Sequence, residues 1–459
     1  MILLKNCFYI ATFFKNDIRN KDILIKGNLI DNIEDNINPL ELHADENDSL
    51  EIIDCSKLLV MPGMVNTHHH MYQLLTRNLP GAQNAKLFDW LAYLYPIWSN
   101  LDEEAVYYST LAASAELLKT GATLTSDHMY LYPSHFKGDI LNLQFSAAQV
   151  AGIRFSPTRG SMTRGQSEGG LPPDNVVQDT DTVVKDMERA LSMFHDPSQL
   201  SMRRVVLAPC SPFSVNEDIM KETVKMGEKN KVVIHTHLAE TEDEDQYCME
   251  KYGMRPLPLM EKMGWIGSNV YFAHGIWFND DELTILQKTS TGVSHCPSSN
   301  MRLGSGIARI REMLDRDIPV SLGVDGSASN DSSDMLGEAR NAMLLQRVKY
   351  GSDALTAREA LGIATQKGAQ MLGYSKLGTI QPGMGADLAL FDMSSLQYAG
   401  SLKDPLAAII FTGYNHQTAY TIVNGKIIVR EGHFTGYNEE KLAEKVNFIA
   451  EKLWKKAGI

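Results

Sequence analysis

The chain has little cysteine, and its cysteines show no pairing pattern. Five of them are scattered through 459 residues, without a single Cys-x-x-Cys pair. An odd, dispersed set of this kind speaks against a disulfide framework and against a structural zinc knuckle. We therefore expect a protein of a reducing compartment.

Long hydrophobic runs are also missing. No segment is apolar for long enough to cross a bilayer as a helix. The opening residues, Met1 to Asn6, lack a basic region followed by an apolar core and a small-residue cleavage site. The sequence therefore predicts a cytoplasmic protein that has no membrane partner.

An excess of positive charge is lacking as well. The chain has 43 Lys and Arg against 56 Asp and Glu, which gives a formal net charge of -13. Such an acidic chain is not expected to bind nucleic acid or an anionic membrane by default. A hydrophobic content of 44% is enough for a large core. We expect a small-molecule partner, one large domain with a smaller one, and a homo-oligomer.

The middle of the chain alternates strand-like apolar runs with helix-like segments. Helical periodicity is clear in residues 103–119 and 182–194. Eight strands alternating with helices predict an α/β fold, the (β/α)8 TIM barrel. The eight runs cover residues 59–68, 122–128, 153–159, 205–210, 232–237, 270–274, 292–295 and 320–325.

Short β-rich segments lie near both ends of the chain. They occupy residues 23–30, 51–54, 387–391 and 421–429, and Asn424-Gly425 inside the last segment is a strong hairpin signal. We expect these segments to pair into one small β-sandwich domain built from both termini. The acidic, polar stretch 40–49 predicts a loop.

This pattern predicts four segments of the chain. Residues 1–58 form the first part of the β domain, and residues 59–377 form the barrel. Residues 378–435 complete the β domain, and residues 436–459 form a C-terminal helix.

Histidines and an aspartate end three of the expected barrel strands. His68 and His70 share one face of an extended strand, whereas His69 points the other way. In the run 232–237 the same alternation leaves both His235 and His237 as candidate ligands, and Asp325 ends the run 320–325. Three neutral imidazoles and a carboxylate suit a divalent ion such as Zn²⁺, with Fe²⁺ or Mn²⁺ as alternatives, and leave room for a water. A TIM barrel carries its chemistry at these strand ends, so the pattern predicts a hydrolytic metal site.

Further motifs extend this pattern over nearly the whole chain. They are Pro62-Gly63 ahead of His68-x-His70, His237-x-x-Glu240, Ala273-His274-Gly275, Ser294-His295-Cys296-Pro297, Asp325, and the glycine-rich residues 378–388. With these motifs the sequence resembles the amidohydrolase superfamily, in its aminohydrolase branch acting on purines, pyrimidines and triazines. Within that branch, residues 66–73, 208–214 and 300–306 look most like those of 8-oxoguanine deaminases.

The resemblance implies a ligand set and a metal count. It selects His237, three residues before Glu240, over His235, so that His68, His70, His237 and Asp325 hold the ion. Many amidohydrolases bind two metals bridged by a modified lysine on the fourth strand, but residues 205–210 contain no lysine. One divalent metal per chain is therefore expected.

The resemblance also implies roles for the catalytic residues. Asp325 would take the proton of the metal-activated water, and Glu240 would protonate a ring nitrogen of the substrate. His274 would donate to the developing oxyanion, unless it is a satisfied core histidine. The acidic residues that follow Glu240, up to Asp245, are expected to be solvated.

Two residues are expected at the substrate. Gln73 offers a donor and an acceptor that match the edge of a heterocyclic base, unless it lies on a helix surface. Cys210 is expected to line the same pocket. Trp90 and Trp98 are expected on an apolar helix face rather than on the substrate ring.

The predicted activity is therefore metal-dependent hydrolytic deamination of an oxo-purine base, above all 8-oxoguanine, with release of ammonia. The alternative is an isocytosine or hydroxy-triazine aminohydrolase or chlorohydrolase. A thioether-nucleoside deaminase is a weaker alternative, because the anchors for a sugar and an amino-acid tail are not identified. A non-catalytic scaffold is weaker too, because it would not need Glu240, His274 and Asp325 together.

Overall fold

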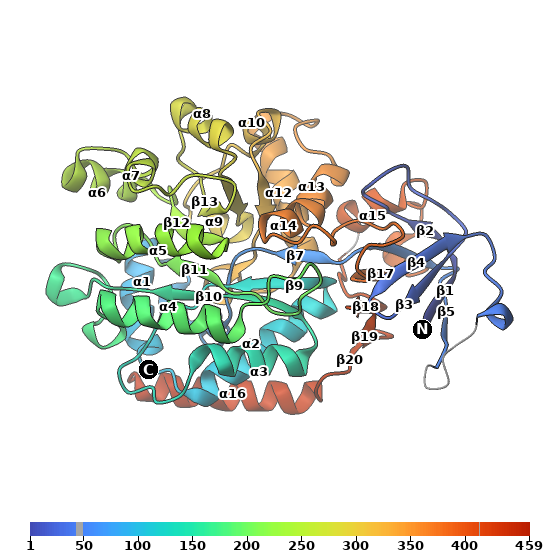
Figure 1. Cartoon of the computed structure of the whole chain (residues 1–459), viewed down its shortest axis with the longest axis horizontal. Coiled ribbons are helices and arrows are strands. Elements are labelled where there is room, and N and C mark those ends of the chain that lie inside the picture. Colours follow the sequence, from blue (N-terminus) through green and yellow to red (C-terminus); the bar gives the residue numbers. More distant parts are fainter. Residues whose placement is uncertain (43–48, 413) are drawn as a thin grey trace.

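The structure has a barrel and a smaller β region beside it. The computed structural model describes residues 1–42, 49–412 and 414–459. Most of the loop expected at residues 40–49 lies outside these ranges. Figure 1 shows strands from both ends of the chain, coloured blue and red, side by side at one end of the molecule.

The barrel confirms the predicted (β/α)8 architecture. In the described part of the chain, eight strands form one parallel sheet in the order β15-β14-β13-β12-β11-β10-β9-β7. The strands are buried, as expected where helices cover a parallel sheet. Their bounds are β7 Met64–Asn66, β9 Ala122–Asp127, β10 Arg154–Ser161, β11 Val206–Pro209, β12 Ile234–Leu238, β13 Val270–His274, β14 Gly292–His295 and β15 Val320–Leu322.

Backbone contacts close the sheet between its first and last strands. The Thr67 amide donates to the Leu322 carbonyl at 3.0 Å. Just beyond, β8 (His69–His70) pairs in parallel with β16 (Asp325–Gly326). The last expected run, residues 320–325, is therefore broken after Leu322, and Asp325 belongs to the short strand that lies beside the histidines.

The first expected run, residues 59–68, also divides in two. Its first half is β6 (Leu58–Pro62), which pairs with a strand of the small domain, and only β7 belongs to the barrel. The chain changes sheet at Gly63, where a Cβ would lie 2.2 Å from the Thr123 side chain. The apolar pattern could not show this break, because both halves are buried.

Helices cover the outside of the barrel. The predicted helix 103–119 matches α2, in which the Asp102 side chain accepts from the Ala105 amide at the N-terminus. The predicted helix 182–194 corresponds to α4. The helices in the barrel part of the chain are α1 Leu87–Trp98, α2 Glu103–Lys119, α3 Ile140–Ala151, α4 Thr180–Phe194, α5 Glu217–Asn230, α6 Glu242–Tyr252, α7 Pro256–Lys262, α8 Asp280–Thr289, α9 Pro297–Arg302, α10 Ile310–Asp315, α11 Ser327–Asn330, α12 Met335–Tyr350, α13 Ala357–Ile363 and α14 Gln366–Met371.

The small domain consists of two sheets built from both termini, as predicted. One has the order β4-β3-β1-β5 and the other β2-β6-β17-β18-β19-β20. The Asn424-Gly425 hairpin is confirmed, because both residues have positive φ between β18 and β19. The strands are β1 Ile2–Cys7, β2 Tyr9–Ile10, β3 Lys21–Lys26, β4 Leu29–Glu34, β5 Glu51–Asp54, β17 Leu388–Asp392, β18 Tyr420–Val423, β19 Lys426–Arg430 and β20 His433–Phe434.

Two features tie the C-terminal part of the chain to the barrel. A buried ion pair joins Arg154 of β10 to Asp387, with Nη2 2.8 Å from Oδ1. The last helix, α16 (Glu439–Lys456), packs against α2, and the Trp454 indole donates to the Leu75 carbonyl at 2.8 Å. One more helix, α15 (Pro405–Phe411), follows β17 and precedes β18 along the chain. Within the described ranges, none of the helices combines the length and the apolar character needed to cross a membrane.

Candidate active site

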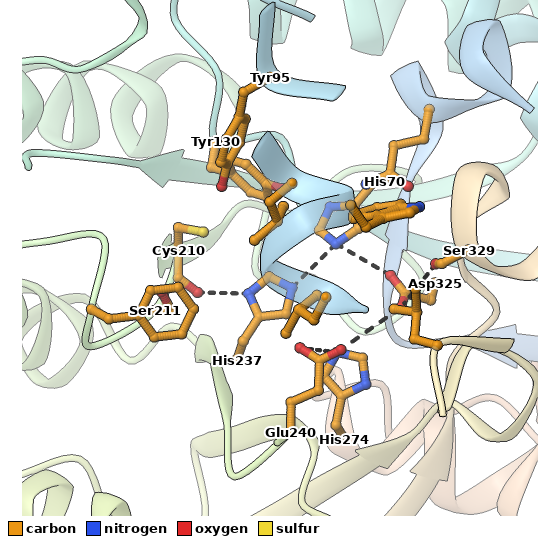
Figure 2. Close-up of a pocket in the computed structure, with 16 residues that line it drawn as sticks. His70, Tyr95, Tyr130, Cys210, Ser211, His237, Glu240, His274, Asp325 and Ser329 are labelled. Atoms are coloured by element: carbon orange, nitrogen blue, oxygen red, sulfur yellow. Dashed lines mark hydrogen bonds and ion pairs between the residues drawn. The ribbon is translucent and has the colours of Figure 1, made fainter. Parts of the chain in front are cut away.

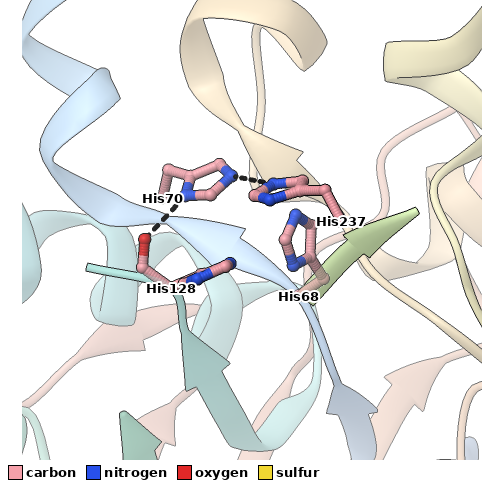
Figure 3. Close-up of side chains that lie close together, drawn as sticks. All are labelled: His68, His70, His128 and His237. Carbon is pink, nitrogen blue, oxygen red and sulfur yellow. Dashed lines mark hydrogen bonds between the residues drawn. The ribbon is translucent and has the colours of Figure 1, made fainter. Parts of the chain in front are cut away.

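The predicted metal ligands converge where the barrel strands end. Nε2 of His70 lies 3.2 Å from Nε2 of His237. Oδ1 of Asp325 lies 3.3 Å from Nε2 of His70 and 3.5 Å from Nε2 of His68. Figure 3 shows the rings of His68, His70 and His237 close together, and Figure 2 shows Asp325 beside His70. Side chains far apart in the sequence thus form one compact set of donors.

In His70 and His237, the Nδ1 atom forms a hydrogen bond with a backbone carbonyl oxygen. Nδ1 of His70 donates to the His128 carbonyl at 2.8 Å, and Nδ1 of His237 donates to the Cys210 carbonyl at 2.6 Å. A carbonyl only accepts, so both rings carry their proton on Nδ1 and expose a lone pair on Nε2.

A third imidazole fixes the tautomer of His68. His235 donates from Nδ1 to the Tyr271 carbonyl at 3.1 Å, and its Nε2 lies 2.8 Å from Nδ1 of His68. Burial lowers the pKa of His235 well below its usual value, so this ring is neutral and its Nε2 accepts from His68. His68 therefore also presents the lone pair of Nε2. Of the two candidate ligands on this strand, His237 belongs to the donor set, and His235 bonds Nδ1 of His68.

The arrangement fits a divalent cation. No hydrogen-bond partner among the described residues reaches the buried Nε2 of His68. The Nε2 atoms of His70 and His237 face each other as two acceptors, which a cation between them would reconcile. Burial lowers the pKa of His237 to about 3, which keeps this ring neutral, as a metal ligand must be. Imidazole nitrogens with one carboxylate are a donor set typical of Zn²⁺.

Backbone strain is also present at these strand ends. His274 has φ +71° and Asp325 has φ +63°, in the left-handed region that residues with a side chain rarely adopt. Ala239, the residue before Glu240, has φ +54°. Strain of this kind persists only where the surrounding structure imposes it, and it often accompanies functional geometry.

Glu240 and His274 lie next to this donor set. Oε2 of Glu240 is 3.5 Å from Nε2 of His274, which in turn is 4.0 Å from Oδ2 of Asp325. Nδ1 of His274 bonds Oδ1 of Asn300 at 2.9 Å, so its Nε2 is directed at the two carboxylates. Burial raises the pKa of Glu240 to about 7. A carboxyl group in this state can exchange a proton near neutral pH.

One pocket brings the expected substrate residues to these groups (Figure 2). Gln73 and Cys210 both line it, together with His70, His237, Asp325 and Glu240. Gln73 is buried in the 3-10 helix η2 (Met71–Thr76), and its Oε1 has no partner among the described residues. Its amide fits only because residue 326 is a glycine, since a Cβ there would lie 1.9 Å from Oε1.

The pocket wall is largely aromatic and aliphatic. Trp98 is buried away from this wall, as expected, but Trp90 lines the pocket, so the expectation of a purely helix-face role is wrong for Trp90. The described lining includes no lysine or arginine. Besides Gln73, Cys210, His274 and the metal and acid groups, the wall consists of Leu87, Trp90, Leu91, Tyr95, Tyr130, Ser211, Phe213, Leu303 and Ser329.

Several supporting residues were not identified from the sequence. His128 directly follows β9, and one of its ring nitrogens lies within 4.8 Å of ring nitrogens of His68, His70 and His237. His128 ends the expected run 122–128, as the ligands end their runs, so its position in the sequence could have identified it. Asn300 lies in the segment 300–306, which resembles that of 8-oxoguanine deaminases. No local sequence pattern reveals that Asn300 contacts His274.

Comparison with known proteins places the chain among metal-dependent hydrolases. Residues 59–428 match the model of the Amidohydrolase family. The chain is 44% identical to an 8-oxoguanine deaminase of Pseudomonas aeruginosa over 357 residues, which are 78% of this chain and 79% of that protein. It is 35% identical to hydroxydechloroatrazine ethylaminohydrolase of Pseudomonas sp. strain ADP over 409 residues, which are 88% of this chain and 85% of that protein.

A solved structure is similar over the full length. It is the atrazine chlorohydrolase from Arthrobacter aurescens TC1 complexed with zinc, with a TM-score of 0.92 and 28% sequence identity. The match covers 98% of this chain and 100% of that chain. The similarity therefore includes the barrel and the small β domain together.

Proposed function

This chain belongs to the amidohydrolase family, and on that premise we propose that it is a metal-dependent deaminase of an oxo-purine base, above all 8-oxoguanine. Its relatives include deaminases and other hydrolases, and the chain is an enzyme of hydrolytic C–N cleavage. The specific base is supported by the 44% identity to an 8-oxoguanine deaminase.

His68, His70, His237 and Asp325 would hold one divalent ion. Zn²⁺ is favoured by the nitrogen and carboxylate donors and by the zinc in the similar atrazine chlorohydrolase. When bound, such an ion lowers the pKa of a water and so supplies a nucleophile at neutral pH. Three protein nitrogens and one carboxylate describe a single site.

The proton transfers are assigned to Asp325 and Glu240. Asp325 accepts the proton of the attacking water. Glu240, whose pKa of about 7 allows both protonation states near neutrality, gives a proton to the ring nitrogen beside the amine-bearing carbon and assists the loss of ammonia. His274, oriented by Asn300, is assigned to the developing oxyanion, toward which its Nε2 would be directed.

Gln73 is assigned to the edge of the base. Gln73 lines the pocket, and its buried Oε1 has no partner among the described residues, so a ring N–H or an amine of the substrate would satisfy it. The flat aromatic wall, with Trp90, Tyr95 and Tyr130, suits a heterocycle.

One observation carries the proposal. The Nε2 atoms of His70 and His237 meet at the pocket that also contains Glu240 and His274, and a ring nitrogen of His68 belongs to the same group of donor atoms. A binding scaffold would have no need for a buried acid at this point. A hydroxy-triazine aminohydrolase is the second candidate, because the chain is 35% identical to hydroxydechloroatrazine ethylaminohydrolase.

A substrate panel tests the assignment. The zinc-loaded protein is incubated with 8-oxoguanine, isocytosine, an amino-hydroxy-triazine, a chloro-triazine and a thioether nucleoside, and ammonia and chloride are measured. We expect ammonia from 8-oxoguanine with the highest kcat/KM. A higher kcat/KM for the triazine amine would favour the second candidate, and chloride release would indicate a chlorohydrolase.

A further inference from the structure

Glu244 differs from its neighbours in the acidic run that follows Glu240. Glu242 and Asp243 are exposed, but Glu244 is only 2% exposed. The expectation that the later acids of this run are solvated is therefore wrong for Glu244. A buried carboxyl group in a first helical turn requires a partner that offsets its loss of hydration.

That partner is the backbone of Glu240. Oε2 of Glu244 accepts the Glu240 N–H at 3.0 Å, and this bond is buried. No partner among the described residues reaches Oε1 of Glu244. Burial raises the pKa of Glu244 to about 8, so near neutral pH the group is largely a neutral acid that still accepts from the amide.

The peptide unit between Ala239 and Glu240 is held on both edges. Its N–H is bonded by Glu244 from α6, and its carbonyl accepts from the amides of Ile276 at 2.8 Å and Trp277 at 3.1 Å. The unit follows Ala239, whose positive φ is unfavourable for a residue with a side chain. Since strained backbone relaxes where its contacts are lost, these bonds determine where the Glu240 side chain points.

We propose that Glu244 is the positioning residue of Glu240: by accepting the Glu240 amide it keeps the strained turn after β12 in the one conformation that directs the Glu240 carboxyl group at His274 and the pocket. This inference rests on the proposed function, in which Glu240 transfers protons.

The test compares variants that keep or remove the acceptor. Glu244→Gln retains an amide oxygen at the same place, whereas Glu244→Leu fills the space without accepting, and Glu244→Ala is the alternative if the leucine variant does not fold. The matched control is Glu242→Ala, an exposed acid in the same helical turn. Metal content and melting temperature are measured for each variant.

Activity is then read in the ammonia-release assay. We expect Glu244→Leu to lower kcat at least about tenfold with KM changed by less than about threefold, because substrate binding does not involve Glu240's backbone. Glu244→Gln and Glu242→Ala should stay within about threefold of wild type. In a Glu240→Gln background, Glu244→Leu should cause almost no further loss, because both changes remove the same function.

Wild-type kcat in Glu244→Leu would overturn the proposal. So would a loss that persists in full when Glu240 is already Gln, since Glu244 would then act on something else.

A second readout does not depend on activity. Hydrogen exchange of the Glu240 amide should be at least about tenfold faster in Glu244→Leu than in wild type, and unchanged in Glu244→Gln. Unchanged exchange in Glu244→Leu would also overturn the inference. If wild type releases no ammonia from any compound but the exchange result holds, the proposed function fails while the positioning of residue 240 stands.

Discussion

Single side chains determine the proton chemistry, and Glu240 is the clearest case. Replacing Glu240 by Gln keeps its size but removes the group that gives and takes the proton. Turnover should fall by at least about a hundredfold, the usual scale for a general acid-base group. Metal content, from elemental analysis, and melting temperature should stay near wild type, because Glu240 is outside the ligand set. Full turnover in Glu240→Gln would assign ring protonation to another residue.

In the proposed function, Gln73 recognises the edge of the base. Truncating it to Ala leaves polar atoms of a buried base without partners, at a cost of about 1 to 3 kcal/mol for each unsatisfied group. We expect this loss in kcat/KM for 8-oxoguanine, measured by steady-state kinetics, with metal content unchanged. Wild-type kinetics in Gln73→Ala would show that Gln73 does not contact the base, and the base edge would then not be placed near His70.

At the residue scale, the sequence predicted what alternation and strand ends can reveal. His68 and His70 lie on one face of a strand, and Asp325 lies at the end of a run. His235 and His237 were equivalent by alternation alone, because the Tyr271 carbonyl that engages His235 comes from a distant segment. The role of Asn300 was not predictable for the same reason. Glu244 is close to Glu240 in the sequence, but its burial was not visible in an acidic run that was expected to be solvated.

Whole elements hold these residues in place, and α16 shows how far from the site this support extends. It packs against α2, and Trp454 bonds the carbonyl of Leu75 in η2, the turn that carries Gln73. The helix presents a buried apolar face that includes Ile449, while Phe448 beside it is 60% exposed.

This pair gives a matched stability test. Ile449→Ala should lower the free energy of unfolding by about 2 to 5 kcal/mol, because it removes buried methyl groups and leaves a cavity. Phe448→Ala should change it by no more than about 0.5 kcal/mol, because an exposed side chain loses little packing. Chemical denaturation measures both. Equal effects of the two substitutions would contradict the packing of α16 described above.

Helices and strands with strong local sequence signals were predictable. The sheet to which a strand belongs was not, because it depends on which other strand it pairs with. The helix at residues 103–119 has a capping aspartate and a clear period, and its bounds match α2. The run 59–68 appears as one strand in the sequence, but its halves pair with different sheets because the chain crosses between them at Gly63.

For the whole molecule, the proposed metal would link activity to stability. Chelation should abolish ammonia release, and Zn²⁺, Fe²⁺ or Mn²⁺ should restore it. Because an ion that binds only the folded chain adds about 2.7 kcal/mol of stability at a hundred times its Kd, chelation should also lower the melting temperature. Retained activity after elemental analysis has verified metal removal would contradict a metal-dependent mechanism.

The overall architecture was predictable because alternating strands and helices, together with motifs spread over the chain, point to one fold. The homo-oligomeric state, the cytoplasmic location and the four segment boundaries stay predictions of the sequence.

The central claim is that one metal ion in this chain supports deamination. It is tested most directly by titrating the metal-free protein with Zn²⁺ while ammonia release from 8-oxoguanine is measured. We predict that activity rises linearly and reaches its maximum at about one equivalent per chain, as expected for a single site of three histidines and one aspartate. Activity in the metal-free protein, or a maximum reached only at about two equivalents, would contradict this account.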